Sequence, residues 1–375
     1  MRIAFVTSHI NRSNQWNWFS ENLKQRNIFH LHIIINHYEP LMLADIRELG
    51  IPVVFLKHKN IFSFVYNYFR VLFLLRKYKI DIVHTELPYG NLIGQLAAST
   101  CFIRNRVLTC ESLTWGIDYN SRKQKINDWL SLRLTKKVIA LTALSKKFLV
   151  DRYNLKKEDV LIIHHALKAN DYLDISPARV EALRSELQIP ADRFVIGLVS
   201  RFVYWKGIEY AVKAMIPVVQ MYPEALLLIF GDKEGESFAE ISSLITKHSL
   251  QDHIKHVGYV ADNVALYTML DVQIHVPVDA YVETFGIVII EGMISGCPQI
   301  LTLTGISNDS ARDGENCILV DHCSANQISE AIILLRENPA LRKKLSVEAK
   351  ADAIRMFQYD TKVERHITLY KELLD

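Results

Sequence analysis

Short apolar runs rich in β-branched residues alternate along the chain with longer stretches of helical periodicity. In the first half the short runs are RIAFVT, LHIIIN, IPVVFL, DIVHT, RVLTC, KVIALT and VLIIHH. After a polar stretch around residues 169–192 the alternation resumes with FVIGLVS, ALLLIFG, IKHVG, DVQIHV, QILTL and CILV. Strands that alternate with helices form parallel sheets covered on both faces. The pattern therefore predicts an α/β protein with two Rossmann-like domains.

The segment DISPARVEALRSELQIPADR lies between the two blocks and contains two prolines and a short helical pattern. We interpret it as a linker, residues 171–190, between an N-terminal domain at residues 1–170 and a second domain that begins at residue 191. In sheets of this kind ligands bind beyond the carboxyl ends of the strands. The expected site is therefore a cleft between the domains, lined by residues that directly follow strands.

Charge is distributed unevenly, although the net charge of the chain is only +3. Residues 1–168 contain 25 Lys and Arg against 12 Asp and Glu, whereas the remainder contains 19 against 29. A basic half can attract nucleic acid, anionic lipid or a phosphorylated substrate, or can simply carry solvated lysines, and charge alone does not choose among these. No recognised nucleic-acid motif is present, so nucleic acid is not an expected partner.

The N-terminal sequence MRIAFVT runs directly into a strand pattern and lacks the features of a signal peptide, which predicts a cytoplasmic protein. The most membrane-like segment, residues 61–79, is interrupted by Asn67 and Arg70 and is too short to span a bilayer. It fits either a half-buried helix or a helix lying in the membrane interface. The five cysteines have no CxxC spacing, so neither a disulfide framework nor a zinc site is predicted.

The stretch ETFGIVIIEGMISGCP, residues 283–298, places two glutamates around a predicted helix that ends at the Gly-Cys-Pro. Glu283 then lies before the helix and Glu291 on its second turn. Gly286 lets a ligand approach the free amides of the helix start, where a phosphate binds favourably. Carboxylates instead suit the hydroxyl groups of sugar and ribose, so the pair indicates a nucleotide-sugar. The alternative is that the glutamates only stabilise the helix dipole.

A second motif, GLVSRFVYWKGIEYAVKAM at residues 197–215, reads as a strand, a short loop and a helix. Its loop carries Arg201 and Lys206, and two cations in one loop can clamp a diphosphate, Arg as a fork and Lys as a point charge. Taken alone, each would more often be a surface charge. Combined with the two glutamates, they indicate a pyrophosphate between two sugars.

These motifs resemble the donor domain of family 4 glycosyltransferases of the GT-B fold, in which two Rossmann-like domains face each other across a cleft. The similar segments are the strand-R-loop-KG-helix, LLLIFGD, HVGYVADNVALYTMLDVQIHVP, the E-x7-E pair and DGENCILV. In the first half, DIVHTELPYGNLIG and KVIALTALSKKFL are similar to acceptor-domain segments. The resemblance implies an acceptor-binding domain at residues 1–170, a donor domain at residues 191–355 and, at residues 356–375, a closing helix that crosses back to the N-terminal domain.

The resemblance also assigns roles to individual residues. Arg201 and Lys206 would bind the donor diphosphate, and Glu291 the ribose. Glu283 would hold the transferred sugar and could alternatively be a nucleophile. The remaining donor-binding residues, near the transferred sugar and the base, would be Phe285, Gly286, Ile287, Gly258, Tyr259, Val260 and Asn263. Such enzymes retain the anomeric configuration, usually without a metal, and the sequence contains no D-x-D. No cofactor or metal is therefore expected.

The N-terminal half departs from the family pattern. The loop SHINRSNQWNWF lacks the usual glycine pair near the donor phosphates, and Glu111 stands where the family often has a histidine. Glu111 and His84 are candidate catalytic residues, although a lone histidine at a strand end is more often structural. His164 and His165 replace an asparagine-glycine turn and fit hinge packing or anion binding. Further candidates are Asp309, in place of a glutamate, and Trp115 and Tyr119, which could stack on a sugar.

The sequence, with the family resemblance, thus predicts a retaining glycosyltransferase that moves a sugar from a nucleotide-sugar, with UDP as the expected nucleotide, to a glycan or lipid-linked acceptor, as in cell-surface polysaccharide or lipopolysaccharide synthesis. The protein would be cytoplasmic and peripheral on the inner face of the cell membrane, with an anionic membrane surface as a further partner of its basic domain. Two alternatives stay open. One is an epimerase or phosphorylase that acts on a sugar phosphate, and the other is a scaffold protein of the same fold without catalytic activity.

Overall fold

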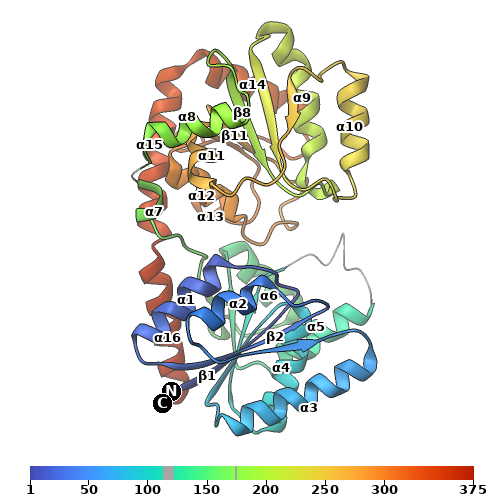
Figure 1. Cartoon of the computed structure of the whole chain (residues 1–375), viewed down its shortest axis with the longest axis vertical. Coiled ribbons are helices and arrows are strands. Elements are labelled where there is room, and N and C mark those ends of the chain that lie inside the picture. The colour runs from blue at the N-terminus through green and yellow to red at the C-terminus, as the bar shows by residue number, and fades with distance from the viewer. Residues whose placement is uncertain (113–121, 174) are drawn as a thin grey trace. The chain divides into compact units, whose positions relative to one another are not determined.

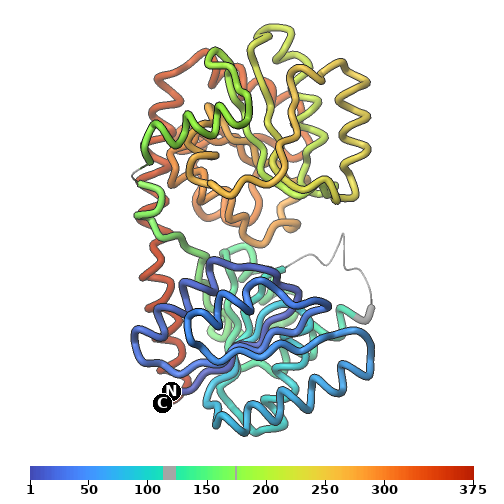
Figure 2. Tube along the Cα trace, in the orientation of Figure 1, coloured from blue at the N-terminus to red at the C-terminus, as the bar shows by residue number. Residues whose placement is uncertain are grey.

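The computed structural model describes residues 1–112, 122–173 and 175–375. The chain divides into two compact units. Unit 1 contains Met1–Ala166 and Asp360–Asp375, and unit 2 contains Leu167–Tyr359. The trace in Figure 2 follows the chain out of unit 1 and back into it. Unit 1 is therefore discontinuous in sequence.

Unit 1 is built around a parallel sheet that has seven strands among the described residues. In spatial order they are β3 (Val53–Lys57), β2 (Phe29–Asn36), β1 (Arg2–Ser8), β4 (Ile82–Glu86), β5 (Asn105–Cys110), β6 (Lys137–Ala140) and β7 (Val160–Ile162). Phe5 packs against Trp16 on one face of the sheet, whereas Ala4 and Val6 belong to the core on the other. Both faces are thus covered, which explains why the strands are apolar almost throughout.

Two groups of helices cover the sheet of unit 1 (Figure 1). One face carries α1 (Asn14–Gln25), α2 (Leu41–Glu48) and α16 (Tyr359–Leu374). The other carries α3 (Ile61–Lys77), α4 (Pro88–Thr100), α5 (Arg122–Leu134) and α6 (Ala143–Tyr153), and a short 3-10 helix, η1 (Lys157–Asp159), precedes β7. The residues predicted as a closing helix, 356–375, thus include α16, and Asp360–Asp375 belongs to unit 1.

Unit 2 repeats the same architecture with a parallel sheet of six described strands. Their order is β10 (Ile254–His256), β9 (Ala225–Phe230), β8 (Phe194–Val199), β11 (Val272–His275), β12 (Gln299–Leu301) and β13 (Ile318–Leu319). One face is covered by α9 (Ile208–Met221), α10 (Phe238–Lys247) and α14 (Ala325–Glu337), and the other by α8 (Pro177–Glu186), α11 (Asn263–Met269) and α12 (Ile287–Ser295). The remaining elements are η2 (Tyr204–Lys206), α7 (Asn170–Leu173), α13 (Ser307–Ser310) and α15 (Pro339–Met356).

The strand order reverses once in each sheet. In unit 1, β1 lies between β2 and β4, and in unit 2, β8 lies between β9 and β11. The connections on either side of such a point run to opposite faces of the sheet, which leaves a crevice at the carboxyl ends of the two strands. Residues that follow β1, β4, β8 and β11 are therefore placed for ligand binding.

The residues predicted as a linker, 171–190, form part of α7 and all of α8 and belong to unit 2. Residues 61–79 form α3 and its end, with one buried face, as the half-buried interpretation expected. Among the described residues, no helix is long and apolar enough to cross a membrane.

Candidate active site

The motif that follows β8 brings its cations to the strand-order reversal of unit 2. Gly207 ends η2 and begins α9 with φ +71°, and a Cβ placed on it would lie 2.0 Å from the carbonyl oxygen of Val276. The loop can therefore pack directly on the chain that leaves β11 only because residue 207 is glycine. Trp205 is buried beneath the loop, and its carbonyl oxygen accepts a hydrogen bond of 3.0 Å from Val278 N.

This packing brings Lys206 against Glu283. The ammonium group of Lys206 contacts Glu283 Oε2, and the two side chains are only 12% and 14% exposed. His275, at the end of β11, lies with Nε2 3.6 Å from the same oxygen, and burial together with Lys206 lowers its pKa well below the usual value. Arg201 is exposed and lies over the Trp205 ring at 5.7 Å. Lys206, Glu283 and His275 thus lie together, and Arg201 is exposed at the edge of this cluster.

The start of α12 lies beside this cluster. Gly286 has φ +80°, and a Cβ there would approach Glu283 Cγ at 3.3 Å and His275 Nε2 at 3.5 Å. The helix has no side-chain cap on its N-terminus and no acidic residue in its first turn. Its first two amides, those of Ile287 and Val288, therefore offer hydrogen-bond donors and the positive end of the helix dipole to an anion, whereas Ile289 N donates to Gly286 O at 3.0 Å. The predicted phosphate site and Glu283 lie together in unit 2.

Glu291 lies on the second turn of α12, as predicted, and is 9% exposed. Tyr267 donates a hydrogen bond of 2.9 Å to Oε2, and Asn263 donates one of 3.3 Å to Oε1. Burial nevertheless raises the pKa of Glu291 to about 7. The hydrogen bonds therefore hold the carboxyl group in one position. Because its pKa is close to 7, a bound ligand can shift it between the protonated and the ionised form.

The segment predicted to face the base borders this carboxyl through Asn263, the first residue of α11. Gly258 has φ +86° and nothing within 4 Å of an added Cβ, and Tyr259 is 81% exposed. Val260 packs on the core of the α8 and α11 face. Asp309 lies in α13, whose start is joined to the site because Ile306 N donates a hydrogen bond to Phe285 O at 2.7 Å.

In unit 1, Glu111 directly follows β5 and pairs with His165, with 3.1 Å between Oε2 and Nε2. Burial alone would raise its pKa, but His165 and Lys362 hold it below the usual value, so the carboxylate is ionised. His84 is buried inside the unit, with Nδ1 2.6 Å from Tyr370 OH and Nε2 2.7 Å from Thr109 Oγ1. These two hydroxyl partners favour a structural position for His84.

A charged network that the sequence did not reveal surrounds Glu111. Lys362 Nζ, on α16, donates to Gln15 Oε1 at 2.7 Å and lies 3.4 Å from His165 Nδ1. Glu86, at the end of β4, accepts a bond of 3.0 Å from the Trp16 ring. Burial and Glu111 raise the pKa of Glu86, whereas burial lowers that of Lys362 to about 8. No sequence pattern joins residue 362 to residue 86 or 111.

A row of aromatic rings at the strand ends was also missed. His9, His37 and His58 follow β1, β2 and β3, and neighbouring rings in this row are 5.3 Å apart between centroids. Tyr89 completes the group, 3.9 Å from His58 and 6.0 Å from His9. Each histidine follows a predicted strand directly or after one intervening residue, so the strand-end rule could have found all three.

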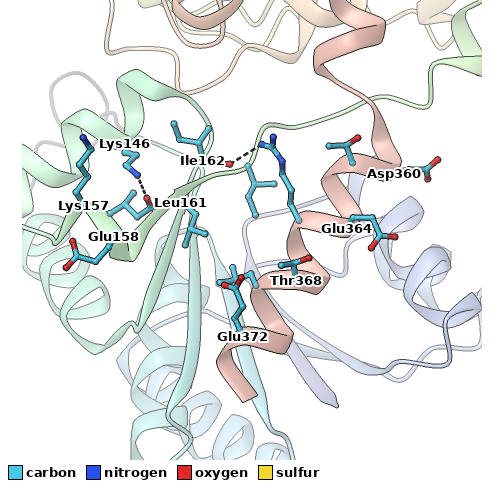
Figure 3. A pocket seen from close by; sticks show the side chains of 14 residues that line it. Lys146, Lys157, Glu158, Leu161, Ile162, Asp360, Glu364, Thr368 and Glu372 are labelled. Carbon is cyan, nitrogen blue, oxygen red and sulfur yellow. Dashed lines mark hydrogen bonds between the residues drawn. The ribbon is translucent and has the colours of Figure 1, made fainter. Parts of the chain in front are cut away.

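A separate groove of about 690 Å³ lies in unit 1 between β7 and α16. Figure 3 shows its side chains, among them Lys146, Lys157, Glu158, Asp360 and Glu364. None of the residues predicted from the sequence to bind donor or acceptor lines it. The residues of this lining belong to unit 1, whereas the cluster of Lys206, Glu283 and the α12 start lies in unit 2.

Two predictions remain, one about aromatic stacking on a sugar and one about metal ions. Trp115 and Tyr119 lie outside the described residues. Within the described part of the chain, no group of three or more His, Cys, Asp or Glu side chains is arranged to hold a metal ion. The expected independence from metal stays a prediction.

Two family models match the sequence of this chain. A model described as "Glycosyltransferase Family 4" matches residues 19–170, and one described as "Glycosyl transferases group 1" matches residues 179–352. The chain belongs to the family 4 glycosyltransferases. The predicted family is thereby confirmed, and the protein is a glycosyltransferase enzyme.

Individual relatives of this glycosyltransferase extend over most of its length. Alpha-monoglucosyldiacylglycerol synthase of Acholeplasma laidlawii is 26% identical over 345 residues, which cover 87% of this chain and 83% of the relative. A glycosyltransferase from Rickettsia africae superposes with a TM-score of 0.84 at 22% identity, covering 100% and 98% of the two chains. Alr3699/HepE of Anabaena, solved with UDP-glucose, gives 0.84 at 21%, covering 100% and 99%. These structures confirm the GT-B fold.

Proposed function

We propose that the chain is a retaining glycosyltransferase that moves a sugar from a UDP-sugar to a glycan or lipid-linked acceptor. The observation that carries the proposal is the convergence of Lys206, Glu283 and the uncapped start of α12 in unit 2. A cation and free amides suit a diphosphate, and a carboxylate beside them suits sugar hydroxyls. A nucleotide-sugar contains both groups next to each other.

The nucleotide-sugar would bind beside Lys206, Glu283 and the start of α12 in one orientation. Its diphosphate would bind the amides of α12, Lys206 and Arg201, which can swing in from the rim because it is exposed. The ribose would replace the hydrogen bonds that Glu291 receives from Tyr267 and Asn263. The transferred sugar would bind Glu283 and the backbone from Phe285 to Ile287. The base would lie along residues 258–263.

The reaction breaks the bond between the anomeric carbon and the diphosphate oxygen, and the electron pair leaves with UDP. The acceptor oxygen forms the new bond on the same face of the sugar, and its proton passes to the leaving diphosphate. Negative charge therefore builds on the diphosphate, where Lys206, Arg201 and the α12 amides stabilise it more in the transition state than in the ground state. These two side-chain cations would supply the charge that a metal ion provides in metal-dependent transferases.

The acceptor would bind unit 1 near Glu111. His165 and Lys362 keep this carboxylate ionised, so it can accept a hydrogen bond from an acceptor hydroxyl. The name of the Acholeplasma relative, a synthase of a glucosylated diacylglycerol, supports a lipid acceptor. The UDP-glucose bound to the Anabaena protein supports UDP as the nucleotide. A lipid acceptor would place the protein at the cytoplasmic membrane surface, as in the synthesis of cell-surface polysaccharide or lipopolysaccharide.

The test is nucleotide release from a panel of UDP-, GDP- and ADP-sugars. We expect slow release from a UDP-sugar, and Arg201→Ala should lower its rate by about 100-fold because it removes charge from the leaving diphosphate. Glu291→Ala should mainly raise KM, by about tenfold, because ribose contacts are made in ground state and transition state alike. Lys213→Ala is the matched control, since Lys213 is a cation of the same unit that pairs with Glu209 on the surface of α9.

Three outcomes would contradict the proposal. Release from none of the donors, with no nucleotide binding, would remove the donor site and favour the scaffold alternative. Equal loss of activity in Lys213→Ala would show that charge in general, not the site, matters. An inverted anomeric configuration in the product, read by proton NMR, would exclude the retaining reaction. Full activity in excess EDTA is expected, because the cations belong to the protein.

A further inference from the structure

Helix α3 exposes large apolar side chains to solvent. The exposed fractions are 65% for Ile61, 81% for Phe62, 48% for Val65, 60% for Tyr66, 60% for Phe69 and 51% for Phe73. Four of these six side chains are aromatic. Single exposed apolar residues are ordinary, but a contiguous group of this size on one element marks an interaction surface.

These side chains share one face of the helix. With the 100° step of an α-helix, the six positions fall within an arc of roughly 140°. The opposite side is buried against the sheet and α4 through Val71, Leu74 and Leu75. Core packing therefore uses only half of the apolar surface of α3, and the exposed half, which we call the α3 face, has no covering element among the described residues of unit 1.

The surroundings of the α3 face are strongly basic. Residues 57–80 contain no Asp or Glu, and their cations are Lys57, Lys59, Arg70, Arg76, Lys77 and Lys79. Arg76 and Lys77 are exposed in the last turn of the helix. Arg70, at the edge of the apolar arc, lies over the Phe73 ring at 5.6 Å. An apolar face bordered by cations without neutralising acids is complementary to an apolar layer covered by anions.

We propose that the α3 face is a membrane-docking surface that lies in the headgroup region of an anionic phospholipid bilayer. Phe and Tyr side chains would enter the boundary between headgroups and acyl chains, and the cations would bind lipid phosphates. Two copies of the face would bring like charges together, which disfavours self-association. The inference deepens the proposed function, since it rests on a lipid-linked acceptor, but it requires nothing of the donor site.

The test is sedimentation of the full chain with vesicles of phosphatidylcholine, with and without about 30% phosphatidylglycerol. We expect binding that depends on the anionic lipid and weakens as salt rises, because the cations are screened. Replacing Phe62 and Phe69 by Gln should weaken binding roughly tenfold or more, since both rings leave the apolar layer. Arg76→Gln with Lys77→Gln should reduce the preference for the anionic lipid.

The matched control replaces Met221 and Val347 by Gln. Both lie in unit 2 and are 56% and 57% exposed, so this variant also replaces two exposed apolar side chains, but away from α3. It should bind vesicles like the unchanged protein. Because all four replaced residues are exposed, circular dichroism should detect no loss of helix in either variant.

Several results would overturn the inference. Absence of binding to either vesicle, or equal binding by the Phe62/Phe69 variant, would exclude the α3 face as a membrane surface. A dimer in sedimentation velocity that only this variant dissociates would identify a contact between copies instead. If the proposed function is wrong but the inference holds, the chain binds vesicles and releases no nucleotide. If both hold, the Phe62/Phe69 variant still releases nucleotide at the normal rate in the absence of lipid.

Discussion

Glu291 is deeply buried and accepts hydrogen bonds from neighbouring side chains, and these two features have opposite effects on its pKa. Tyr267 and Asn263 stabilise the carboxylate, yet burial dominates and raises its pKa from 4.5 to about 7. A buried carboxyl group of this kind binds its proton more tightly in the folded chain than in the unfolded chain. Its charge is therefore a cost to folding near neutral pH, and a ribose that donates hydrogen bonds would offset this cost.

We predict that Glu291→Gln flattens the pH dependence of stability. From about pH 4.5 to 7 the folded chain holds the proton and the unfolded chain releases it, so the free energy of unfolding should fall as pH rises, by up to about 3 kcal/mol. Gln cannot ionise and removes this slope. Urea unfolding at pH 5 and pH 8 measures the difference. The exposed Glu234→Gln serves as control, and an identical slope in Glu291→Gln and the unchanged protein would contradict the prediction.

Several site residues could be recognised from local sequence, because their partners lie within one motif. The stretch from Glu283 to Pro298 predicts a helix that follows Glu283 and carries Glu291, and the structure has α12 there with glycines at both ends. The network of Glu86, Glu111 and Lys362 could not be recognised, because only the folded chain brings α16 to the strand ends. Glu111 was found through family resemblance alone.

At the scale of elements, the loop from β8 to α9 depends on one glycine. Gly207 and Gly314 have similar backbone angles, with φ +71° and +66°, but only Gly207 lies against other atoms. Substitution of Gly314 thus measures the cost of the left-handed conformation alone. Substitution of Gly207 adds a steric clash with the Val276 carbonyl, which belongs to the backbone and cannot rotate away.

We therefore predict that Gly207→Ala lowers the free energy of unfolding by about 2–4 kcal/mol and Gly314→Ala by about 1 kcal/mol. Gly207→Ala should also reduce donor turnover, since the loop carries Lys206 to Glu283. Urea unfolding together with nucleotide release would test both effects. Equal destabilisation by the two substitutions would mean that the loop moves without cost and that its position is not fixed by packing.

The alternation of apolar runs predicted the strands well where both faces are covered. FVIGLVS and ALLLIFG correspond to β8 and β9, which lie near the centre of their sheet. CILV yields only the two-residue β13, because an edge strand pairs on one side and ends where its neighbour ends. The apolar pattern thus predicts that a strand is present. Its length depends on pairing with the neighbouring strand, which the local sequence does not encode.

At the scale of the whole molecule, unit 1 includes a helix from the far end of the sequence. Val363, Ile367, Tyr370 and Leu373 of α16 are buried in unit 1, and Tyr370 contacts His84 at the centre of the unit. Tyr370→Ala should therefore destabilise unit 1 by about 3–5 kcal/mol, because it opens a cavity and leaves Nδ1 of His84 without its hydroxyl partner, while Nε2 keeps Thr109.

The exposed Thr368→Ala, on the same helix, should change stability by no more than about 0.5 kcal/mol. Hydrogen exchange resolved by peptide would distinguish the units. Faster exchange in β4 and β5 with unchanged exchange in β8 and β9 is the expected result for Tyr370→Ala. Equal acceleration in both sheets would show that the two units unfold together rather than separately.

The return of α16 to unit 1 also determines the order in which the protein can mature during its synthesis. Residues 167–359 complete unit 2, so its sheet and helices can assemble while residues 360–375 have still to emerge from the ribosome. Unit 1 begins first but must wait for residues 360–375 to close its core. A newborn chain would therefore hold a folded unit 2 while unit 1 still lacks a helix of its core, and α16 would complete unit 1.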